Sequence, residues 1–305
     1  MSTRRNLIKS IMAAPFLATM APPAFAFFTE NRILRKIPST GELLPAIGMG
    51  SYQTFNVAND EARKQNLLAV LKTFFDAGGT LIDSSPMYGL SESVIGEILA
   101  NIEPKPEVFA ASKVWTYGKE AGVTAIEESR RRMQVKQMDL MQVHNLRDWQ
   151  VHLETLNTMK QNGQIRYTGI TTSRISQYQD FEAVMRDHAL DFVQLNYNIK
   201  VREAEKRLLP LAMDKGVAVI VNMPFEKGRL FKLVKSQALP EWSKEFDCNS
   251  WGQFFLKFIL SHPAVTCAIP ATSKVHHMKD NMQAMTGRLP NAKQRQKMLE
   301  LFESF

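Results

Sequence analysis

Eight short apolar segments recur along the chain, and stretches with helical spacing separate them. Most are continuous apolar runs, as expected for strands that are buried on both faces of a parallel sheet. Eight such units in 305 residues favour an α/β fold with a single closed (β/α)8 TIM barrel, and an open doubly wound sheet is the alternative. The expected strands span residues 43–49, 80–84, 108–113, 139–144, 165–171, 191–197, 217–222 and 264–270.

The intervening helices are indicated by apolar residues at spacings of three and four. Leu71 and Phe74 belong to one such stripe, which the glycines of residues 77–79 end, and Ser91 is the expected N-cap of the next helix. We also expect an N-terminal β-hairpin before the barrel. Residues 291–305 predict a C-terminal amphipathic helix after it.

The first 26 residues have the composition of an export signal. A basic segment with paired arginines, residues 3–9, precedes a short apolar core, and a small-x-small sequence follows at residues 24–26. The arginine pair is typical of the twin-arginine class. We therefore expect a signal peptide over 1–26, a barrel domain over 27–305, the twin-arginine export machinery as a partner and a periplasmic location. A basic tail or an uncleaved anchor is the alternative, and an unused signal would leave the protein in the cytoplasm.

Charge and cysteine content exclude several classes of function. The formal net charge is +8, and three of the positive charges lie in the export-signal segment. No basic block follows that would track a nucleic-acid backbone, so nucleic acid is not an expected partner. Cys248 and Cys267 are the two cysteines, and their spacing is not that of a metal site or a disulfide framework. No later apolar run is long enough for a stable membrane span.

Polar residues stand at the ends of consecutive expected strands. Asp83, Lys113, His144 and Thr171 end the second to fifth strands, and Gln194 lies near the end of the sixth. The C-terminal ends of the strands carry the chemistry in a barrel of this kind. Ionisable groups in these positions therefore predict an active site.

Several strings, in this order, resemble the aldo-keto reductase superfamily over nearly all of the chain after the export-signal segment. They are PAIGMGSYQT, DAGGTLIDSSPMYGLSESVIGEIL, ASKVW, MDLMQVHN, NGQIRYTGI and IPATSKVHHMKDN. The resemblance implies a catalytic tetrad of Asp83, Tyr88, Lys113 and His144, and a nicotinamide dinucleotide as the cofactor. It also implies that the chain reduces aldehydes or ketones to alcohols.

The chemistry of these four residues agrees with that role. Hydride delivery to a carbonyl carbon leaves an alkoxide, which needs a proton from a general acid. The Tyr88 phenol would donate it, the Lys113 ammonium would lower the pKa of the phenol, Asp83 would anchor the lysine, and His144 would polarise the carbonyl. Taken singly, Asp83 could cap a helix, Lys113 could lie on the rim, and Tyr88 and His144 could be packing residues.

The nicotinamide half of the expected cofactor site departs from the family pattern. The resemblance places Gly50, Ser51 and Tyr52 beside the nicotinamide, with Gln194 at its carboxamide. Thr171 and Thr172 stand where the family usually has Ser-Asn, and Asn222 stands where it commonly has an aromatic ring that stacks on the nicotinamide.

The phosphate and adenosine half is expected on two later segments. Lys227 and Arg229 are available as cations for the pyrophosphate. The last segment holds the expected ligands of the adenosine and its 2′-phosphate, which are Thr272, Ser273, Lys274, His277, Asp280 and Asn281. We expect NADP in preference to NAD, although His277 replaces an arginine that many relatives have.

Three aromatic residues, Tyr52, Trp115 and Phe225, are expected to line an apolar substrate site. A dinucleotide-binding sensor with little turnover is the alternative function, because the cofactor half departs from the family pattern. A metal-dependent hydrolase would need several converging His or acidic ligands, and only His144 among the histidines ends an expected strand. We therefore expect no metal.

Overall fold

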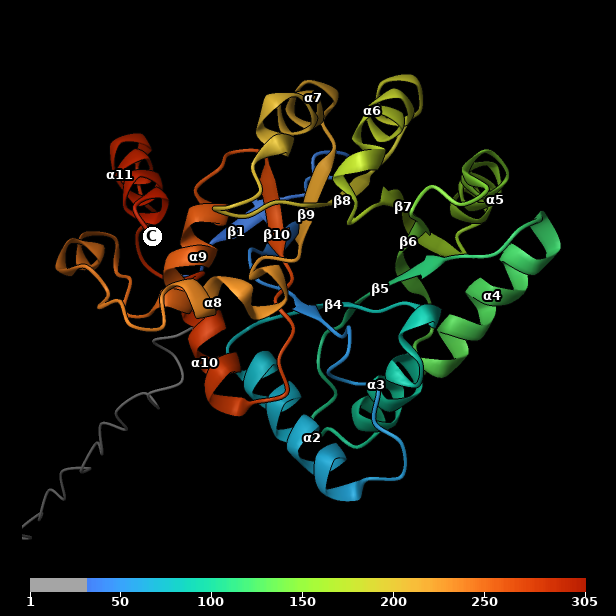
Figure 1. Ribbon diagram of the computed structural model, residues 1–305. Helices are drawn as coiled ribbons and strands as arrows, with labels where there is room; N and C mark the ends of the chain where they lie inside the picture. The colour runs from blue at the N-terminus through green and yellow to red at the C-terminus, as the bar shows by residue number, and fades with distance from the viewer. Residues whose placement is uncertain (1–31) are drawn as a thin grey trace, which may run out of the picture.

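The computed structural model describes residues 32–305, in which eight parallel strands form a barrel surrounded by helices (Figure 1). The strands follow one another in chain order from β3 to β10, and the expected (β/α)8 architecture is confirmed. The barrel strands are β3 (Met49–Gly50), β4 (Leu81–Asp83), β5 (Phe109–Val114), β6 (Met138–His144), β7 (Ile165–Thr171), β8 (Phe192–Asn196), β9 (Ala218–Asn222) and β10 (Val265–Ala268).

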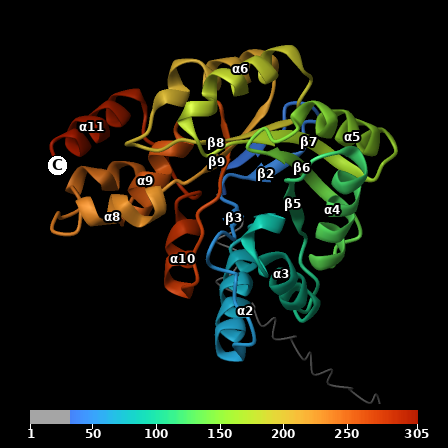
Figure 2. The ribbon, with the colours of Figure 1, turned by 45° about the vertical axis from the view of Figure 1, so that its right-hand side comes forward.

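The helices alternate with these strands and lie on the outside of the barrel (Figure 2). They are α2 (Glu61–Asp76), α3 (Ser91–Ala100), α4 (Lys119–Arg132), α5 (Trp149–Gln161), α6 (Tyr178–Asp187), α7 (Leu208–Lys215), α8 (Arg229–Leu233), α9 (Trp251–Leu260), α10 (Val275–Gln283) and α11 (Ala292–Glu303). Short 3₁₀ helices lie in several loops, among them η1 (Pro86–Tyr88). Within residues 32–305, no helix is both long and apolar enough to cross a membrane.

The expected first strand, residues 43–49, is in fact two strands. β2 (Leu43–Pro45) pairs antiparallel with β1 (Leu34–Lys36) and forms the expected N-terminal hairpin, while β3 enters the barrel. Pro45 lies opposite Leu34 at a position where the antiparallel ladder needs no N–H, and the next N–H, that of Ala46, still donates to the Ile33 carbonyl at 3.0 Å. Parallel bridges from Ile47 to Ala268 and from Gly50 to Ala271 close the barrel between β3 and β10.

Two hydrophobic clusters fill the fold. The larger one lies between the strands and the helices. The smaller one fills the barrel interior and includes Phe109, Tyr167 and Phe192, with Ile37 and Leu44 of the hairpin segment packed against it. The hairpin therefore closes one end of the barrel with apolar side chains and leaves the other end to polar ones.

Helix ends follow the expected chemistry with one correction. Ser91 is the first residue of α3 and not its N-cap, because its hydroxyl donates to the Tyr88 carbonyl at 2.8 Å. The expected C-terminal helix is confirmed as α11, which begins with a capping box of Asn291 and Gln294. The expected signal peptide, residues 1–26, lies outside the described residues, as do residues 27–31 of the expected barrel domain.

Replacement of Phe192 by alanine tests the packed interior. The Phe192 ring is fully buried, with its centroid 5.4 Å from that of Tyr167. We expect Phe192→Ala to lower the free energy of unfolding by about 3–5 kcal/mol in urea titrations. Met213→Ala, at an exposed position on α7, is the control and should change it by less than about 0.5 kcal/mol. Equal effects of the two substitutions would contradict a packed barrel interior.

Candidate active site

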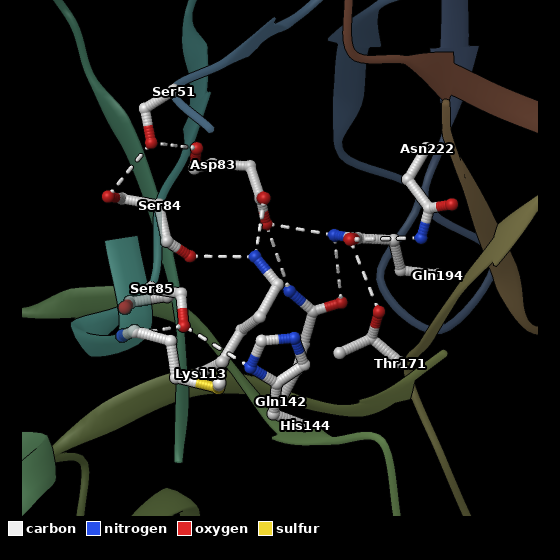
Figure 3. Close-up of polar contacts among 12 residues, drawn as sticks. Ser51, Asp83, Ser84, Ser85, Lys113, Gln142, His144, Thr171, Gln194 and Asn222 are labelled. Carbon is white, nitrogen blue, oxygen red and sulfur yellow. Dashed lines mark hydrogen bonds and ion pairs between the residues drawn. The ribbon is translucent and has the colours of Figure 1, made fainter. Parts of the chain in front are cut away.

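A buried ion pair lies at the centre of the polar end of the barrel. Lys113 Nζ donates to Asp83 Oδ2 at 2.5 Å and to the Ser84 carbonyl at 2.7 Å (Figure 3). Both side chains are almost fully buried. β4 and β5 are adjacent parallel strands, so the pair forms across one step of the barrel. The strands thus bring together two of the expected catalytic residues.

Side-chain amides hold the second oxygen of Asp83. Asp83 Oδ1 accepts from Gln194 Nε2 at 2.8 Å and from Gln142 Nε2 at 3.2 Å. Thr171 Oγ1 donates to Gln194 Oε1 at 3.2 Å (Figure 3). Charge-assisted bonds of this kind offset the cost of burying a carboxylate.

Tyr88 is the last residue of η1, and its ring lies near the ion pair. The Ser85 hydroxyl accepts from the Met87 N–H and caps this short helix. Lys113 Nζ lies 5.1 Å from the centroid of the Tyr88 ring, and the His144 ring centroid lies 6.2 Å from it. The structure therefore gathers all four members of the expected tetrad around the Tyr88 ring.

Burial and charge set the protonation of this cluster. Burial raises the pKa of the Tyr88 phenol above its ordinary value, while the Lys113 charge acts in the opposite direction. The expectation that Lys113 leaves the Tyr88 pKa lowered is therefore corrected, because desolvation outweighs the ammonium. Burial alone would lower the pKa of Lys113, but Asp83 and Tyr88 hold it above its ordinary value. Neutral Tyr88 thus faces a charged lysine.

His144 is a neutral imidazole in this environment. Burial, together with the charges of Lys113, Arg174 and Arg147, lowers the pKa of His144 to about 3. Its Nδ1 shares a hydrogen bond of 3.2 Å with the Ser85 hydroxyl. A neutral ring with one nitrogen already bonded can offer the other to a substrate oxygen.

Asn222 completes the ring of amides beside the ion pair. Its Nδ2 donates to the Thr172 carbonyl at 3.2 Å and lies 3.4 Å from Gln194 Oε1. Its Oδ1 is buried and accepts no hydrogen bond from residues 32–305. An orphaned buried acceptor calls for a donor from outside the chain. A carboxamide NH₂ group is such a donor, so Asn222 fits the nicotinamide position expected for it.

Gly50, Ser51 and Thr172 also have structural roles. A Cβ on Gly50 would lie 2.8 Å from the Ile269 carbonyl, so glycine is needed where β3 approaches the chain after β10. The Ser51 hydroxyl donates to the Asp83 carbonyl at 3.0 Å. Thr172 Oγ1 donates to Gln177 Oε1 at 2.6 Å. These contacts fix the backbone around the expected nicotinamide position.

The loop after β9 holds its two expected cations differently. Arg229 Nη2 forms an ion pair of 2.7 Å with Glu226, a buried carboxylate, so its charge is partly neutralised. Lys227 is exposed, and its Nζ lies 5.7 Å from the Tyr52 ring centroid. Both residues thus remain at the rim, with Lys227 the more available of the two for a phosphate.

The segment expected to hold the adenosine forms the loop before α10 and the first turns of that helix. Ser273, Lys274 and His277 are exposed there, and Thr272 Oγ1 accepts from the Lys274 N–H at 3.1 Å. Burial and neighbouring cations lower the pKa of His277, so it is neutral at pH 7.

Two further residues of the segment lie deeper. Asp280 accepts from the Ser250 hydroxyl at 2.7 Å and from Gln253 at 2.8 Å, so it joins α10 to α9. Asn281 is buried on the same helix. Packing of the helices therefore accounts for the Asp280 side chain.

The three aromatic residues expected at the substrate each have different neighbours. The Tyr52 ring packs edge-on against Tyr88 at 5.1 Å between centroids, which places it at the catalytic cluster. Trp115 follows β5, and the Arg147 guanidinium covers one face of its ring at 3.5 Å. Phe225 packs against Phe231 at 4.9 Å and against the outer hydrophobic cluster.

Sequence reasoning missed Gln142, Ser85 and Arg147. Gln142 stands two residues before His144 on β6, and a spacing of two points both side chains to the same face of a strand. That spacing was the signal for Gln142. No pattern indicated Ser85 or Arg147, because their roles depend on loop conformation.

A cavity of about 550 Å³ lies away from these residues. Pro38, Ser39 and residues of the α5, α6 and α7 regions line it, including the Lys160–Asp191 ion pair. It contains none of the expected site residues. Over residues 32–305 there is also no group of three or more His, Cys, Asp or Glu that could hold a metal ion.

Comparisons with known proteins identify the family. The model of the "Aldo/keto reductase family" matches residues 46–297. The chain is 28% identical over 258 residues to the methylglyoxal reductase YeaE of Escherichia coli (strain K12), covering 82% of this chain and 88% of that protein. It is 26% identical over 285 residues to L-galactose dehydrogenase of Arabidopsis thaliana, covering 83% and 88% respectively.

A solved structure shares the fold. An aldo/keto reductase from Klebsiella pneumoniae, in complex with NADP and acetate, superposes with a TM-score of 0.72 at 24% identity and covers 86% of this chain and 93% of that one. The family match extends over the barrel and includes Tyr88 and the other three residues of the expected tetrad. The chain therefore belongs to the aldo/keto reductase family, whose members work with a nicotinamide cofactor.

Proposed function

We propose that this protein reduces aldehydes or ketones to alcohols with NADPH, and that Tyr88 is the general acid. The observation that carries the proposal is the position of the Tyr88 ring, 5.1 Å from the Lys113 ammonium that Asp83 holds in place. Two relatives are named methylglyoxal reductase and L-galactose dehydrogenase. Both names describe oxidoreductases, which supports this reaction class.

The chain's own residues supply the proton chemistry. When bound, the dinucleotide supplies a hydride to the carbonyl carbon. The Tyr88 hydroxyl gives its proton to the carbonyl oxygen, and the adjacent Lys113 ammonium stabilises the phenolate that remains. Neutral His144 donates a hydrogen bond to the same oxygen through Nε2, in the tautomer whose Nδ1 accepts the hydrogen bond that it shares with Ser85. Asp83 fixes the lysine and keeps the buried ammonium paired.

Residues on three sides would hold the dinucleotide. Asn222 Oδ1 is free to accept from the carboxamide, and Lys227 is exposed near the expected pyrophosphate position. Ser273 and Lys274 precede α10, where backbone N–H groups and the lysine favour a phosphate. We infer a preference for NADP from this segment, although neutral His277 offers little charge to it.

Tyr88→Phe tests the assignment of the general acid. We expect the kcat for NADPH-dependent reduction of an aldehyde to fall about 10²- to 10⁴-fold, because the phenylalanine ring keeps the packing and loses the proton. NADPH binding by Tyr88→Phe, measured by fluorescence titration, should be unchanged.

The preference for NADP is tested with the wild-type protein. Its kcat/KM for the same aldehyde should be lower with NADH than with NADPH.

One result would contradict the role of Tyr88, and another would contradict the reductase function. Unchanged turnover by Tyr88→Phe would show that Tyr88 is not the general acid. Tight NADPH binding by the wild-type protein without turnover of any aldehyde would support the alternative of a dinucleotide-binding sensor. Asn222, which takes the place of the family's aromatic ring, is the residue that favours this alternative.

The pH dependence of stability tests whether His144 is buried and neutral. The folded-state pKa of His144 is about 3, below its ordinary value of 6.5, so the unfolded chain binds a proton over a range in which the folded chain does not. The stability that His144 contributes is present above pH 6.5 and is lost as the pH falls towards 3. Relative to His144→Gln, the wild-type protein should lose up to about 1.4 kcal/mol per pH unit in urea unfolding. A pH-independent difference would place the folded-state pKa near its ordinary value.

We also propose that residues 1–26 direct export through the twin-arginine machinery to the periplasm. The paired Arg4 and Arg5 before an apolar segment support this. Joint replacement of both by lysine keeps the charge, and we expect the protein to shift from the periplasmic to the cytoplasmic fraction in immunoblots. Lys9→Arg is the control and should leave the distribution unchanged. Equal distribution of the double variant and the wild-type protein would refute the proposal.

A further inference from the structure

Arg147 presents an unpaired guanidinium beside the catalytic cluster. It lies in the loop after β6, with Cζ 3.5 Å from the Trp115 ring centroid and 4.9 Å from that of Tyr117. Stacking uses the faces of the guanidinium and leaves its in-plane N–H donors for an acceptor. Across residues 32–305, no carboxylate forms an ion pair with Arg147 and no acceptor takes a hydrogen bond from its guanidinium. These donors are therefore available to a ligand.

The loop that carries Arg147 is held in a strained conformation. Asn145, Leu146 and Asp148 have left-handed φ angles of 53°, 54° and 49°. The Asn145 N–H donates to the Thr171 carbonyl at 2.7 Å, and Asp148 Oδ2 accepts from the Gly118 N–H at 2.7 Å. Residues other than glycine keep such backbone φ angles only where surrounding contacts hold them. Residues of this kind cluster at functional sites. The loop thus presents Arg147 in a fixed position.

Positive charge accumulates around His144. Arg174, on the loop after β7, is exposed and also forms no ion pair within the described part of the chain. The charges of Arg147 and Arg174 both act on the His144 ring. Asp83, the carboxylate of the catalytic cluster, is already paired with Lys113. The surroundings of the expected carbonyl oxygen are therefore cationic.

The position of Arg147 separates it from the expected dinucleotide phosphates. The expected phosphate ligands lie on the loops that follow β9 and β10. In the closed circle of eight strands, β6 is four positions from β10 and thus faces it across the barrel. Arg147 follows β6 and stacks on residues that follow β5, so it belongs to the substrate side.

We propose that Arg147 binds a carboxylate on the substrate, and that the preferred substrates are aldehydes or ketones that carry one. A carboxylate matches the planar pair of N–H donors that a stacked guanidinium leaves open. Trp115 and Tyr117 hold the guanidinium plane, and Arg174 adds a second positive charge. This inference rests on the proposed reductase function, and it names the substrate class of the same site.

Matched substrates test the proposal. The kcat/KM with NADPH is measured for 4-carboxybenzaldehyde and for 4-methylbenzaldehyde, which have similar shape and differ in charge. We expect the wild-type protein to favour the carboxylate, and Arg147→Met to lower the ratio of the two kcat/KM values about 10- to 100-fold. Arg147→Lys keeps the charge without the planar donors and should lower the ratio less. The intrinsic reactivity of the two aldehydes cancels because the same pair is used throughout.

Lys136→Met is the control for a lost positive charge. Lys136 is exposed just before β6, at the opposite end of that strand from His144, so the ratio should stay at the wild-type value. An unchanged ratio in Arg147→Met would overturn the proposal. A higher kcat/KM for 4-formylphenyl phosphate than for 4-carboxybenzaldehyde would also overturn it, because the site would then select a phosphoryl group.

Calorimetric titration with 4-methylbenzoate, which cannot be reduced, gives a result that does not depend on turnover. We expect Arg147→Met to weaken its binding at least 10-fold, while Lys136→Met should not. If neither aldehyde is reduced by the wild-type protein, the reductase function fails, and the titration still decides whether Arg147 binds a carboxylate. Equal binding by the wild-type protein and Arg147→Met would overturn the proposal.

Discussion

The ion pair between Asp83 and Lys113 is the constraint on which the rest of the site depends. Both groups are removed from water, and a buried ion pair is tolerated only when its remaining donors and acceptors are satisfied. Gln142 and Gln194 donate hydrogen bonds to the Asp83 oxygen that does not contact Lys113, and the Ser84 carbonyl accepts a second hydrogen bond from the ammonium. Loss of one partner of such a pair costs about 3–5 kcal/mol, because the other charge stays buried and unpaired. The strands β4, β5, β6 and β8 must therefore keep one common register for the polar end of the barrel to exist.

That register explains why the sequence predicts the tetrad well. Continuous apolar runs indicate buried parallel strands. In a closed barrel, a charged residue at the C-terminal end of such a run lies at the end of the barrel where active sites are found. Asp83, Lys113 and His144 stand at such strand ends, whereas Tyr88 lies in a loop and was assigned by the resemblance to the aldo-keto reductase superfamily. The split of residues 43–49 into β2 and β3 was not foreseen, because an apolar run does not show which partner each half pairs with. The Arg147–Trp115 stack was also missed, since Arg147 lies among three residues with left-handed φ angles that no local pattern predicts.

The departures from the family pattern on the nicotinamide side form one connected arrangement. Asn222 donates to the carbonyl of Thr172, and Gln194 Oε1 accepts from Thr171 and lies within 3.4 Å of Asn222 Nδ2. An aromatic ring at position 222 would supply a stacking face but no amide, so it would leave the Thr172 carbonyl without this donor. The two threonines and the asparagine therefore act together, and Asn222 Oδ1 is the acceptor that this arrangement leaves unfilled. On the nicotinamide side, the departures from the family pattern are thus connected by hydrogen bonds.

The same cations connect the proton chemistry to the substrate. Lys113, Arg174 and Arg147 all disfavour a proton on His144, so the ring stays neutral and is available as a hydrogen-bond donor to the carbonyl. Lys113 is already paired with Asp83, whereas Arg147 and Arg174 have no partner among residues 32–305. A carboxylate bound at Arg147 would neutralise a charge that now repels protonation of His144, so the pKa of His144 would rise when such a substrate binds. It would start from about 3, and burial, the first cause of the low value, would remain. His144 would thus still be neutral at pH 7, and an anionic substrate would be held without changing the protonation that the reaction needs.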